Sequence, residues 1–258
     1  MHTVAAEIEV RHCYSLAEYD ECVRLERLTW GEDITVPAAI FVVARHSGGQ
    51  VLGAFDAGRM VGFTLALAGL RDAQRFLHSH MTAVLPEFQN RGVARRLKLF
   101  QRHDALKRGI PLVEWTFDPL ELKNARFNLS RLGAVVRRYL PDCYGLTNSP
   151  LHDGLPTDRL VAEWWLDSER VKSVLADNAP PPNAAAARIS FPSNLAELKK
   201  KDRTAGLRIQ SSAREEFQRW FQKGYVATGI ETQGDSSQYI LEPRESIAGL
   251  RLEVFREE

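Results

Sequence analysis

The stretch 81–109 most constrains what this chain can fold into. It begins with a short apolar run that ends at Pro86. Beyond this point Val93, Leu97 and Phe100 recur at the i, i+4 and i+7 spacing of one helix face. The stretch therefore predicts a strand, a tight turn and a helix, in that order.

Cations gather in the expected helix: Arg91, Arg95, Arg96, Lys98 and Arg102. Positive charge in the first turns of a helix opposes the helix dipole by about 0.3–1 kcal/mol per residue, so three arginines there favour a bound anion. The free backbone N–H groups of the first turn point at such an anion. We predict a phosphate-rich ligand at residues 89–95, where Gly92 and Ala94 let it approach the main chain. The alternative is a surface helix whose arginines are merely solvated.

Residues 86–94 read Pro-Glu-Phe-Gln-Asn-Arg-Gly-Val-Ala and carry the pattern Gln/Arg-x-x-Gly-x-Gly/Ala. At these residues the chain resembles the GNAT acyltransferase superfamily, in which this loop binds the pyrophosphate of coenzyme A. The resemblance implies acetyl-CoA or another acyl-CoA as co-substrate. We expect no metal, because the seven histidines are scattered apart from His78 and His80. We expect the main chain of the preceding strand to face the pantetheine and the developing oxyanion. The implied cofactor-binding residues here are Ala83, Val84, Leu85, Gln89, Asn90, Arg91, Gly92, Val93, Ala94 and Arg95.

The order of elements along the chain agrees with this resemblance from residue 7 to about 167. Expected strands are 7–13, 51–55, 60–67, 77–85, 112–117, 135–139 and 160–166, and expected helices are 16–29, from Pro37 to about 46, 93–108, 122–132 and 167–176. The fold class we predict is α/β (α+β), GNAT-like, with a mixed, mostly antiparallel central sheet flanked by helices and a C-terminal extension.

Three parts are expected in the chain. Residues 1–177 form the GNAT acyltransferase domain, and the Pro/Ala-rich run 178–187 forms a linker. Residues 188–258 form a C-terminal extension packed on that domain, with an amphipathic helix at 214–223 and strands at 224–230 and 239–241. The resemblance implies no role for this extension.

A second match to the family lies in the segment 118–144. Its helix ends at Gly133, and Asn124 is expected to contact the pantetheine or the acyl carbonyl. Many family members carry a tyrosine acid four residues before this glycine, but here the residue is Leu129. Another proton donor is therefore needed for the thiolate. Tyr144 is our candidate, and packing of a buried phenol is the alternative.

Three further residues are candidates for the chemistry. His80 shares a strand face with His78 and could take the proton of an acceptor amine near neutral pH, unless both only hydrogen-bond within a polar sheet. Asp118 follows a strand where open sheets present functional groups, or it caps a turn before Pro119. Arg159 could hold a carboxylate of the acceptor or of the acyl group, or form a local pair with Asp158.

Composition limits the partners. The net charge of +1 gives no global field for nucleic acid or an anionic membrane, and three unpaired cysteines suit a reducing cytosol. No run of about 18 apolar residues predicts a membrane span. We expect a cytoplasmic protein with a small-molecule amine and coenzyme A as partners, without nucleic acid or membrane, and leave open a homodimer.

The function predicted from these observations is acyl-CoA-dependent N-acyltransfer, acetyl or succinyl, to a small amine such as an amino acid. The amine attacks the thioester directly. One alternative is a GNAT-fold protein that binds coenzyme A without turnover, which Leu129 favours. Nucleic-acid binding through the basic helix is a further alternative, disfavoured by the low net charge.

Overall fold

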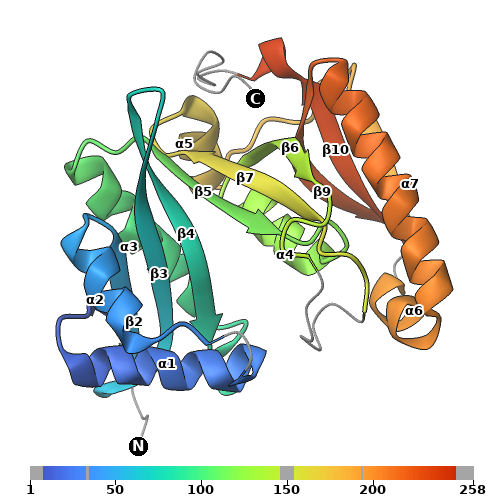
Figure 1. Cartoon of the computed structure of the whole chain (residues 1–258). Coiled ribbons are helices and arrows are strands. Elements are labelled where there is room, and N and C mark those ends of the chain that lie inside the picture. The colour runs from blue at the N-terminus through green and yellow to red at the C-terminus, as the bar shows by residue number, and fades with distance from the viewer. Residues whose placement is uncertain (1–7, 33–34, 146–153, 193, 248–258) are drawn as a thin grey trace, which may run out of the picture. The chain divides into compact units, whose positions relative to one another are not determined.

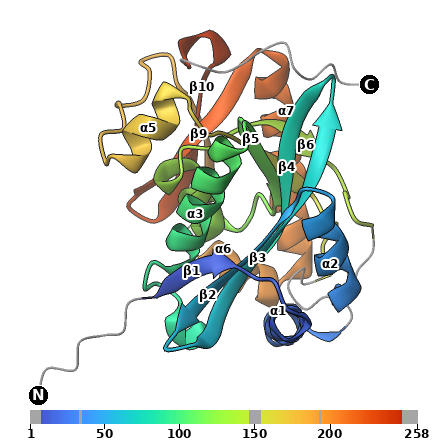
Figure 2. The same cartoon turned by 90° about the vertical axis from the view of Figure 1, so that its left-hand side faces the viewer.

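A computed structural model describes residues 8–32, 35–145, 154–192 and 194–247. The chain divides into two compact units, 1–113 and 114–258, and passes from one to the other within strand β5 (Leu112–Phe117). Each unit is described by itself below, and Figures 1 and 2 show the elements of both. Within the described ranges, no helix has the length and apolar character needed to cross a membrane.

The first unit contains an antiparallel sheet in the order β1-β2-β3-β4. The strands are β1 (Glu9–His12), β2 (Gln50–Asp56), β3 (Arg59–Arg71) and β4 (Gln74–Val84). A tight turn joins β2 to β3, as predicted for the hairpin at residues 50–70, and a second tight turn joins β3 to β4. The strands β3 and β4 run further than predicted towards the turn that joins them, because residues 68–71 of β3 pair with residues 74–77 of β4.

Three helices cover the two faces of this sheet: α1 (Leu16–Trp30), α2 (Ala38–His46) and α3 (Val93–Lys107). Ser15 and Glu18 form a capping box that starts α1. On β3, Phe63 stacks edge-on against Phe41 of α2, whereas a Cβ atom on the adjacent Gly62 would point at Val93 of α3. Because neighbouring strand residues face opposite sides, α2 and α3 lie on opposite faces of the sheet.

The helix α3 is fixed to the sheet by a polar network around Asp104. Its Oδ2 accepts hydrogen bonds from Gln50 Nε2 at 2.6 Å and Arg108 Nη1 at 3.0 Å, and its Oδ1 lies 3.1 Å from His12 Nε2. Gln50 also donates to the carbonyl oxygen of Gln101. These contacts set the position of the helix and therefore of the loop that precedes it.

The second unit contains a six-stranded sheet in the order β5-β7-β6-β9-β10-β8. The strands after β5 are β6 (Val135–Leu140), β7 (Arg159–Trp165), β8 (Ala187–Pro192), β9 (Tyr225–Gln233) and β10 (Ser236–Pro243). β6 pairs antiparallel with both β7 and β9, and the β9–β6 contact joins Ala227 to Val136. The C-terminal part of the chain thus adds three strands to the sheet of this unit.

Helices of the second unit are α4 (Leu122–Arg126), α5 (Glu169–Leu175), α6 (Leu195–Lys201) and α7 (Arg203–Gln222). α4 continues as a π-helical turn over Phe127–Arg131, so the predicted helix 122–132 changes its hydrogen-bond pattern midway. In Figure 1, α7 runs along the strands β9 and β10. Phe217 of α7 stacks edge-on against the buried Tyr239 of β10 with ring centroids 4.9 Å apart.

The C-terminal part differs most from the sequence-based expectation. β8 begins at Ala187, the last residue of the expected linker, and α6 was not predicted at all. α7 starts at Arg203 instead of residue 214, because Asp202 caps it through the N–H of Ala205. Gly206 lies in the first half of α7 and packs near Leu155. A Cβ atom built on Gly206 would lie 3.4 Å from the two methyl carbons of Leu155.

Candidate functional site

The loop before α3 has the backbone that a helix N-terminus needs to bind an anion. The turn η2 (Pro86–Phe88) is followed by two left-handed residues, Asn90 at φ 59° and Gly92 at φ 80°. Gly92 occupies the N-cap position of α3, and no side chain in the described part of the chain caps the helix. The first N–H groups of the helix are therefore left for a ligand or solvent.

Space at this position fits a phosphate group. Among the described residues, a Cβ atom built on Gly92 would have no heavy atom within 4 Å, so the helix start is open on the side where a side chain would project. Phosphate oxygens accept hydrogen bonds from such N–H groups and gain from the helix dipole. The residues 89–95 thus fit the pyrophosphate of coenzyme A in both backbone geometry and charge.

The prediction that the preceding strand offers its main-chain N–H groups to an oxyanion needs a correction. The N–H of Leu85 donates to the carbonyl oxygen of Val61 at 2.9 Å, so it is not available to an oxyanion as we had expected. Donors alternate along an antiparallel strand, and the N–H of Ala83 therefore also points to β3. Of the three main-chain donors that we predicted for the oxyanion, the N–H of Val84 is the one that points away from β3. The carbonyl oxygen of Val84 accepts a hydrogen bond from Gln89 Nε2 at 3.2 Å.

The cations of α3 do not form one solvated stripe. Arg91 lies over the ring of Phe88 with its Cζ 5.4 Å from the centroid, whereas Arg96 donates to the carbonyl oxygen of Ile8. Lys98 is buried, and its ammonium donates to Ser79 Oγ at 2.8 Å and to Gln101 Oε1 at 3.0 Å. Burial lowers the pKa of Lys98 to about 7. Lys98 therefore belongs to the packing of α3 on β4, not to a surface for anions.

His80 lies at an irregular point of the β4 strand. Leu65 pairs with Met81 and Ala66 with Ser79, so His80 is the extra residue of a β-bulge. Bulges redirect side chains and are frequent beside active sites. The ring of His80 is exposed and lies 6.2 Å from that of His78, centroid to centroid. Desolvation by the surrounding protein, followed by the neighbouring His78, lowers the pKa of His80.

Three predicted residues of the second unit lie near one another around the end of β5. The phenol oxygen of Tyr144 is 2.7 Å from Thr116 Oγ1, and the Arg159 guanidinium lies over the Tyr144 ring with Cζ 5.4 Å from its centroid. Asp118 follows two residues after Thr116, and its Oδ1 accepts a hydrogen bond from the N–H of Leu120 at 2.7 Å. The turn interpretation of Asp118 is thus supported.

Asp158 does not orient Arg159 through its carboxylate, as the adjacent pair in the sequence suggested. Arg159 Nη1 donates to the backbone oxygen of Asp158 instead. The fully buried carboxylate of Asp158 accepts two hydrogen bonds from Arg214 of α7, at 2.7 and 3.0 Å, and one from the phenol of Tyr139 at 2.6 Å. The two hydrogen bonds from Arg214 fix the segment before β7 to α7. Desolvation and this hydrogen bond to Asp158 raise the pKa of Tyr139.

The helix of the second family match places its residues differently. Asn124 is exposed on α4, where an amide is accessible to a ligand. Leu129, at the position where the family often has tyrosine, is fully buried within the π-helical turn. A leucine side chain has no acidic proton, so a proton donor for the thiolate has to be another residue.

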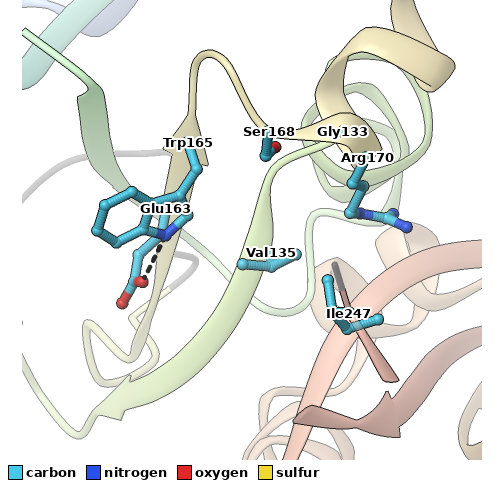
Figure 3. Close-up of a pocket in the computed structure, with 7 residues that line it drawn as sticks. All are labelled: Gly133, Val135, Glu163, Trp165, Ser168, Arg170 and Ile247. Atoms are coloured by element: carbon cyan, nitrogen blue, oxygen red, sulfur yellow. Dashed lines mark hydrogen bonds between the residues drawn. The ribbon is translucent and has the colours of Figure 1, made fainter. Parts of the chain in front are cut away.

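A shallow pocket of the second unit, shown in Figure 3, is not part of the candidate site. Trp165 Nε1 donates to Glu163 Oε2 at 3.3 Å on one of its walls. The pocket leaves no room for a water-sized molecule, which indicates a gap in the packing. It is lined by Gly133, Val135, Glu163, Trp165, Ser168, Arg170 and Ile247.

Comparison with known proteins places this geometry in a family. A family model described as acetyltransferase (GNAT) family matches residues 9–133, the span that includes the loop 86–94. Over this span the chain belongs to the GNAT acetyltransferase family. The prediction of a GNAT-type N-acyltransferase enzyme is thereby confirmed at the level of the family. A search of curated proteins by sequence finds no match.

Solved structures support the GNAT fold. A candidate acetyltransferase of Acinetobacter baylyi aligns with a TM-score of 0.53 and 12% identity over 62% of this chain and 94% of its own. The Salmonella typhimurium protein yncA, solved with its cofactor acetyl-CoA, aligns with a TM-score of 0.51 and 18% identity over 62% and 94%. The ribosomal-protein-S18-alanine N-acetyltransferase of Escherichia coli gives 0.50 and 14% over 61% and 92%. These likenesses confirm the predicted fold class, a mixed α/β fold with a mostly antiparallel sheet.

Two residues that matter for the site were not found from the sequence. Lys199 of α6 and Arg214 of α7 each reach a predicted site segment more than fifty positions earlier in the chain. Neither lies in a motif, and their surroundings in the sequence are rich in charge, as an ordinary solvated helix is. The burial of Lys199, visible only in the folded structure, distinguishes it from its neighbours.

Proposed function

We propose that this protein transfers an acyl group from acyl-CoA to the amine of a small molecule. The observation that carries the proposal is the uncapped start of α3 at Gly92, with its left-handed backbone and its open Cβ position among arginines. Acetyl-CoA is the co-substrate we propose first, with succinyl-CoA as the second candidate. The co-substrate supplies a thioester whose carbonyl carbon accepts the amine.

The residues of the chain divide the chemistry as follows. Residues 89–95 bind the pyrophosphate, Asn124 contacts the pantetheine, and the N–H of Val84 donates to the carbonyl oxygen as it gains negative charge. His80 removes a proton from the acceptor, because its lowered pKa keeps the imidazole neutral at physiological pH. The C–N bond forms, the C–S bond breaks, and Tyr144 donates its proton to the departing thiolate.

Arg159 is the residue that we propose for a carboxylate of the substrate. Its guanidinium is largely buried, with 9% of the residue exposed, and the hydrogen bond to the Asp158 carbonyl holds its orientation. A planar guanidinium fixed in this way can hold a carboxylate by two parallel hydrogen bonds. An amino acid as acceptor, or a dicarboxylic acyl group on the donor, would supply that carboxylate.

Thiol release tests this proposal. Acetyl-CoA and succinyl-CoA are each incubated with the protein and a pool of the twenty amino acids, and free thiol and the mass of any amide product are measured. We expect thiol and amide in equal amounts. Binding of coenzyme A without thiol release would instead identify a protein that holds the ligand without turnover.

The domain division 1–177, 178–187 and 188–258, the cytoplasmic location and a homodimer remain proposals. Sedimentation of the purified chain tests the dimer. The absence of a nucleic-acid partner is tested by a gel shift at low salt, since binding through the arginines of α3 would fall steeply as salt is raised.

A further inference from the structure

The C-terminal part of the chain brings a buried cation to the end of β5. Lys199 of α6 has only 3% of its side chain exposed, and its ammonium donates to Glu121 Oε1 at 2.9 Å. The same ammonium lies 4.0 Å from Asp118 Oδ2. A lysine is almost never buried without a charged partner, so this placement needs both carboxylates.

The carboxylate of Asp118 is only half used by the protein. Oδ1 accepts the N–H of Leu120, whereas 4.0 Å is too long for a hydrogen bond between Oδ2 and Lys199. Within the described ranges of the chain, no hydrogen bond donor is found for Oδ2, and 16% of the side chain is exposed. An acceptor position is therefore open at a buried carboxylate.

The charges around this position balance. Asp118 and Glu121 carry two negative charges, and Lys199 and Arg159 carry two positive charges, with Arg159 close enough to favour the ionised form of Asp118. Burial nevertheless raises the pKa of Asp118, against the effects of Lys199 and Arg159, and Glu121 adds to the rise. Tyr239 also faces this group from β10, with its phenol on the carbonyl oxygen of Pro119. A molecule with one ammonium and one carboxylate leaves such a balance unchanged.

We propose that Asp118 binds the ammonium group of the acceptor through Oδ2, and that Lys199 of the C-terminal part is the positioning residue that keeps this carboxylate ionised and in place. The inference rests on the proposed function and names the acceptor as an amino-acid-like zwitterion, with its carboxylate on Arg159. It also gives residues 188–258 a role, because α6 supplies one of the two cations that favour the ionised form of the binding carboxylate.

Binding experiments test this without requiring turnover. The protein is saturated with coenzyme A, and calorimetry measures the dissociation constant of the best-bound of the twenty amino acids, of its amide and of the acid that lacks its amine. Asp118→Asn should weaken the two ammonium ligands at least tenfold and leave the third unchanged. Equal losses for all three ligands, or an intact protein that binds no amino acid with or without coenzyme A, would overturn the inference.

The pH dependence of amino-acid binding tests the role of Lys199, because two variants should shift it in opposite directions. Lys199→Met removes a positive charge beside Asp118, so its carboxylate takes up a proton at higher pH and binding of the amino acid fails at higher pH than in the parent protein. Glu121→Gln removes a negative charge and should move the loss to lower pH. Lys199→Arg should restore the parent profile.

If Lys199 only stabilises the fold, Lys199→Met and Glu121→Gln should shift the pH at which binding is lost in the same direction, or leave it unchanged. If Lys199→Met does not fold, the Glu121→Gln and Lys199→Arg profiles decide the question alone. Failure of the proposed function is distinguishable, because it shows as missing binding of coenzyme A or missing thiol release, measured on the same samples.

Discussion

Val93, the first residue of α3, packs directly against Gly62 of β3. A Cβ atom on Gly62 would lie 3.4 Å from Val93 Cγ1 and only 2.8 Å from the carbonyl oxygen of Ala83. Gly62 thus lets the start of the helix approach the sheet, and the position of the loop 89–92 before the helix depends on this close contact.

Gly62→Ala should therefore destabilise the protein. A methyl group has to displace the main chain of β4, and overpacking of this kind typically costs about 1–3 kcal/mol. Thermal unfolding should show a lower midpoint by roughly 2–4 °C per kcal/mol for a chain of this size. Gly229→Ala is the matched control, because a Cβ atom there would meet its nearest neighbours at 3.7–3.9 Å. Equal midpoints for the two variants would contradict this account.

Glu26 predicts a pH dependence of stability. Its side chain on α1 is 1% exposed, Oε2 accepts the N–H of Val36 at 3.0 Å, and Oε1 has no hydrogen bond partner among the residues that the structure describes. Burial raises its pKa from 4.5 to about 7. The folded protein thus binds the proton more tightly than the unfolded chain, and this group lowers stability as the pH rises through that window.

Glu26→Gln should remove this loss. The free energy of unfolding of the variant, relative to the parent protein, should increase between about pH 4.5 and pH 7 and level off above, by at most about 3 kcal/mol. Urea unfolding at a series of pH values measures it. Parallel curves for the two proteins would show that Glu26 does not titrate in this range.

Much of the first unit could be predicted from the sequence because its signals are local. Ser15 and Glu18 mark the start of α1, and the apolar spacing after Gly92 marks α3. Hydrogen bonds between strands are not local, which is why Leu85 was expected to have a free N–H although it pairs with Val61. The β-bulge at His80 likewise depends on the register between two strands and leaves no signal of its own in the sequence.

The candidate site of the second unit was predicted only in its separate parts. Asp118 and Arg159 were selected for their places beside expected strands, and these places are as expected. Their partners come from elsewhere: Lys199 lies on a helix with few apolar residues, and Arg214 on a helix whose first half was missed. Pairing of charges across fifty or more positions requires the fold.

Tyr144 is the proposed proton donor to the thiolate. Its phenol is half exposed and paired with Thr116 at 2.7 Å, so Tyr144→Phe removes one hydroxyl and little packing. We expect kcat to fall by up to the roughly 10²–10⁴-fold typical of general acid catalysis, with little change in KM for acyl-CoA. Steady-state rates measure this, and an unchanged kcat would make solvent the donor.

Arg159→Lys tests whether the guanidinium of Arg159 binds a carboxylate of the substrate. A lysine cannot reproduce the two parallel hydrogen bonds of a guanidinium, so KM for a carboxylate-bearing substrate should rise roughly tenfold or more. Amino acids are compared with their amides, and acetyl-CoA with succinyl-CoA. A penalty restricted to succinyl-CoA would assign the carboxylate to the donor, whereas equal responses of acids and amides would remove Arg159 from recognition.

The most direct measurement of the central claim is the affinity of coenzyme A for two variants of Gly92, determined by isothermal titration. Both Gly92→Ala and Gly92→Glu place an L residue at φ 80° and share the same backbone strain, and neither side chain meets a heavy atom at Cβ. Only the glutamate brings a negative charge to the start of α3. If this loop binds the pyrophosphate, Gly92→Glu should bind coenzyme A more than tenfold more weakly than Gly92→Ala. Equal affinities in two folded variants would contradict the account.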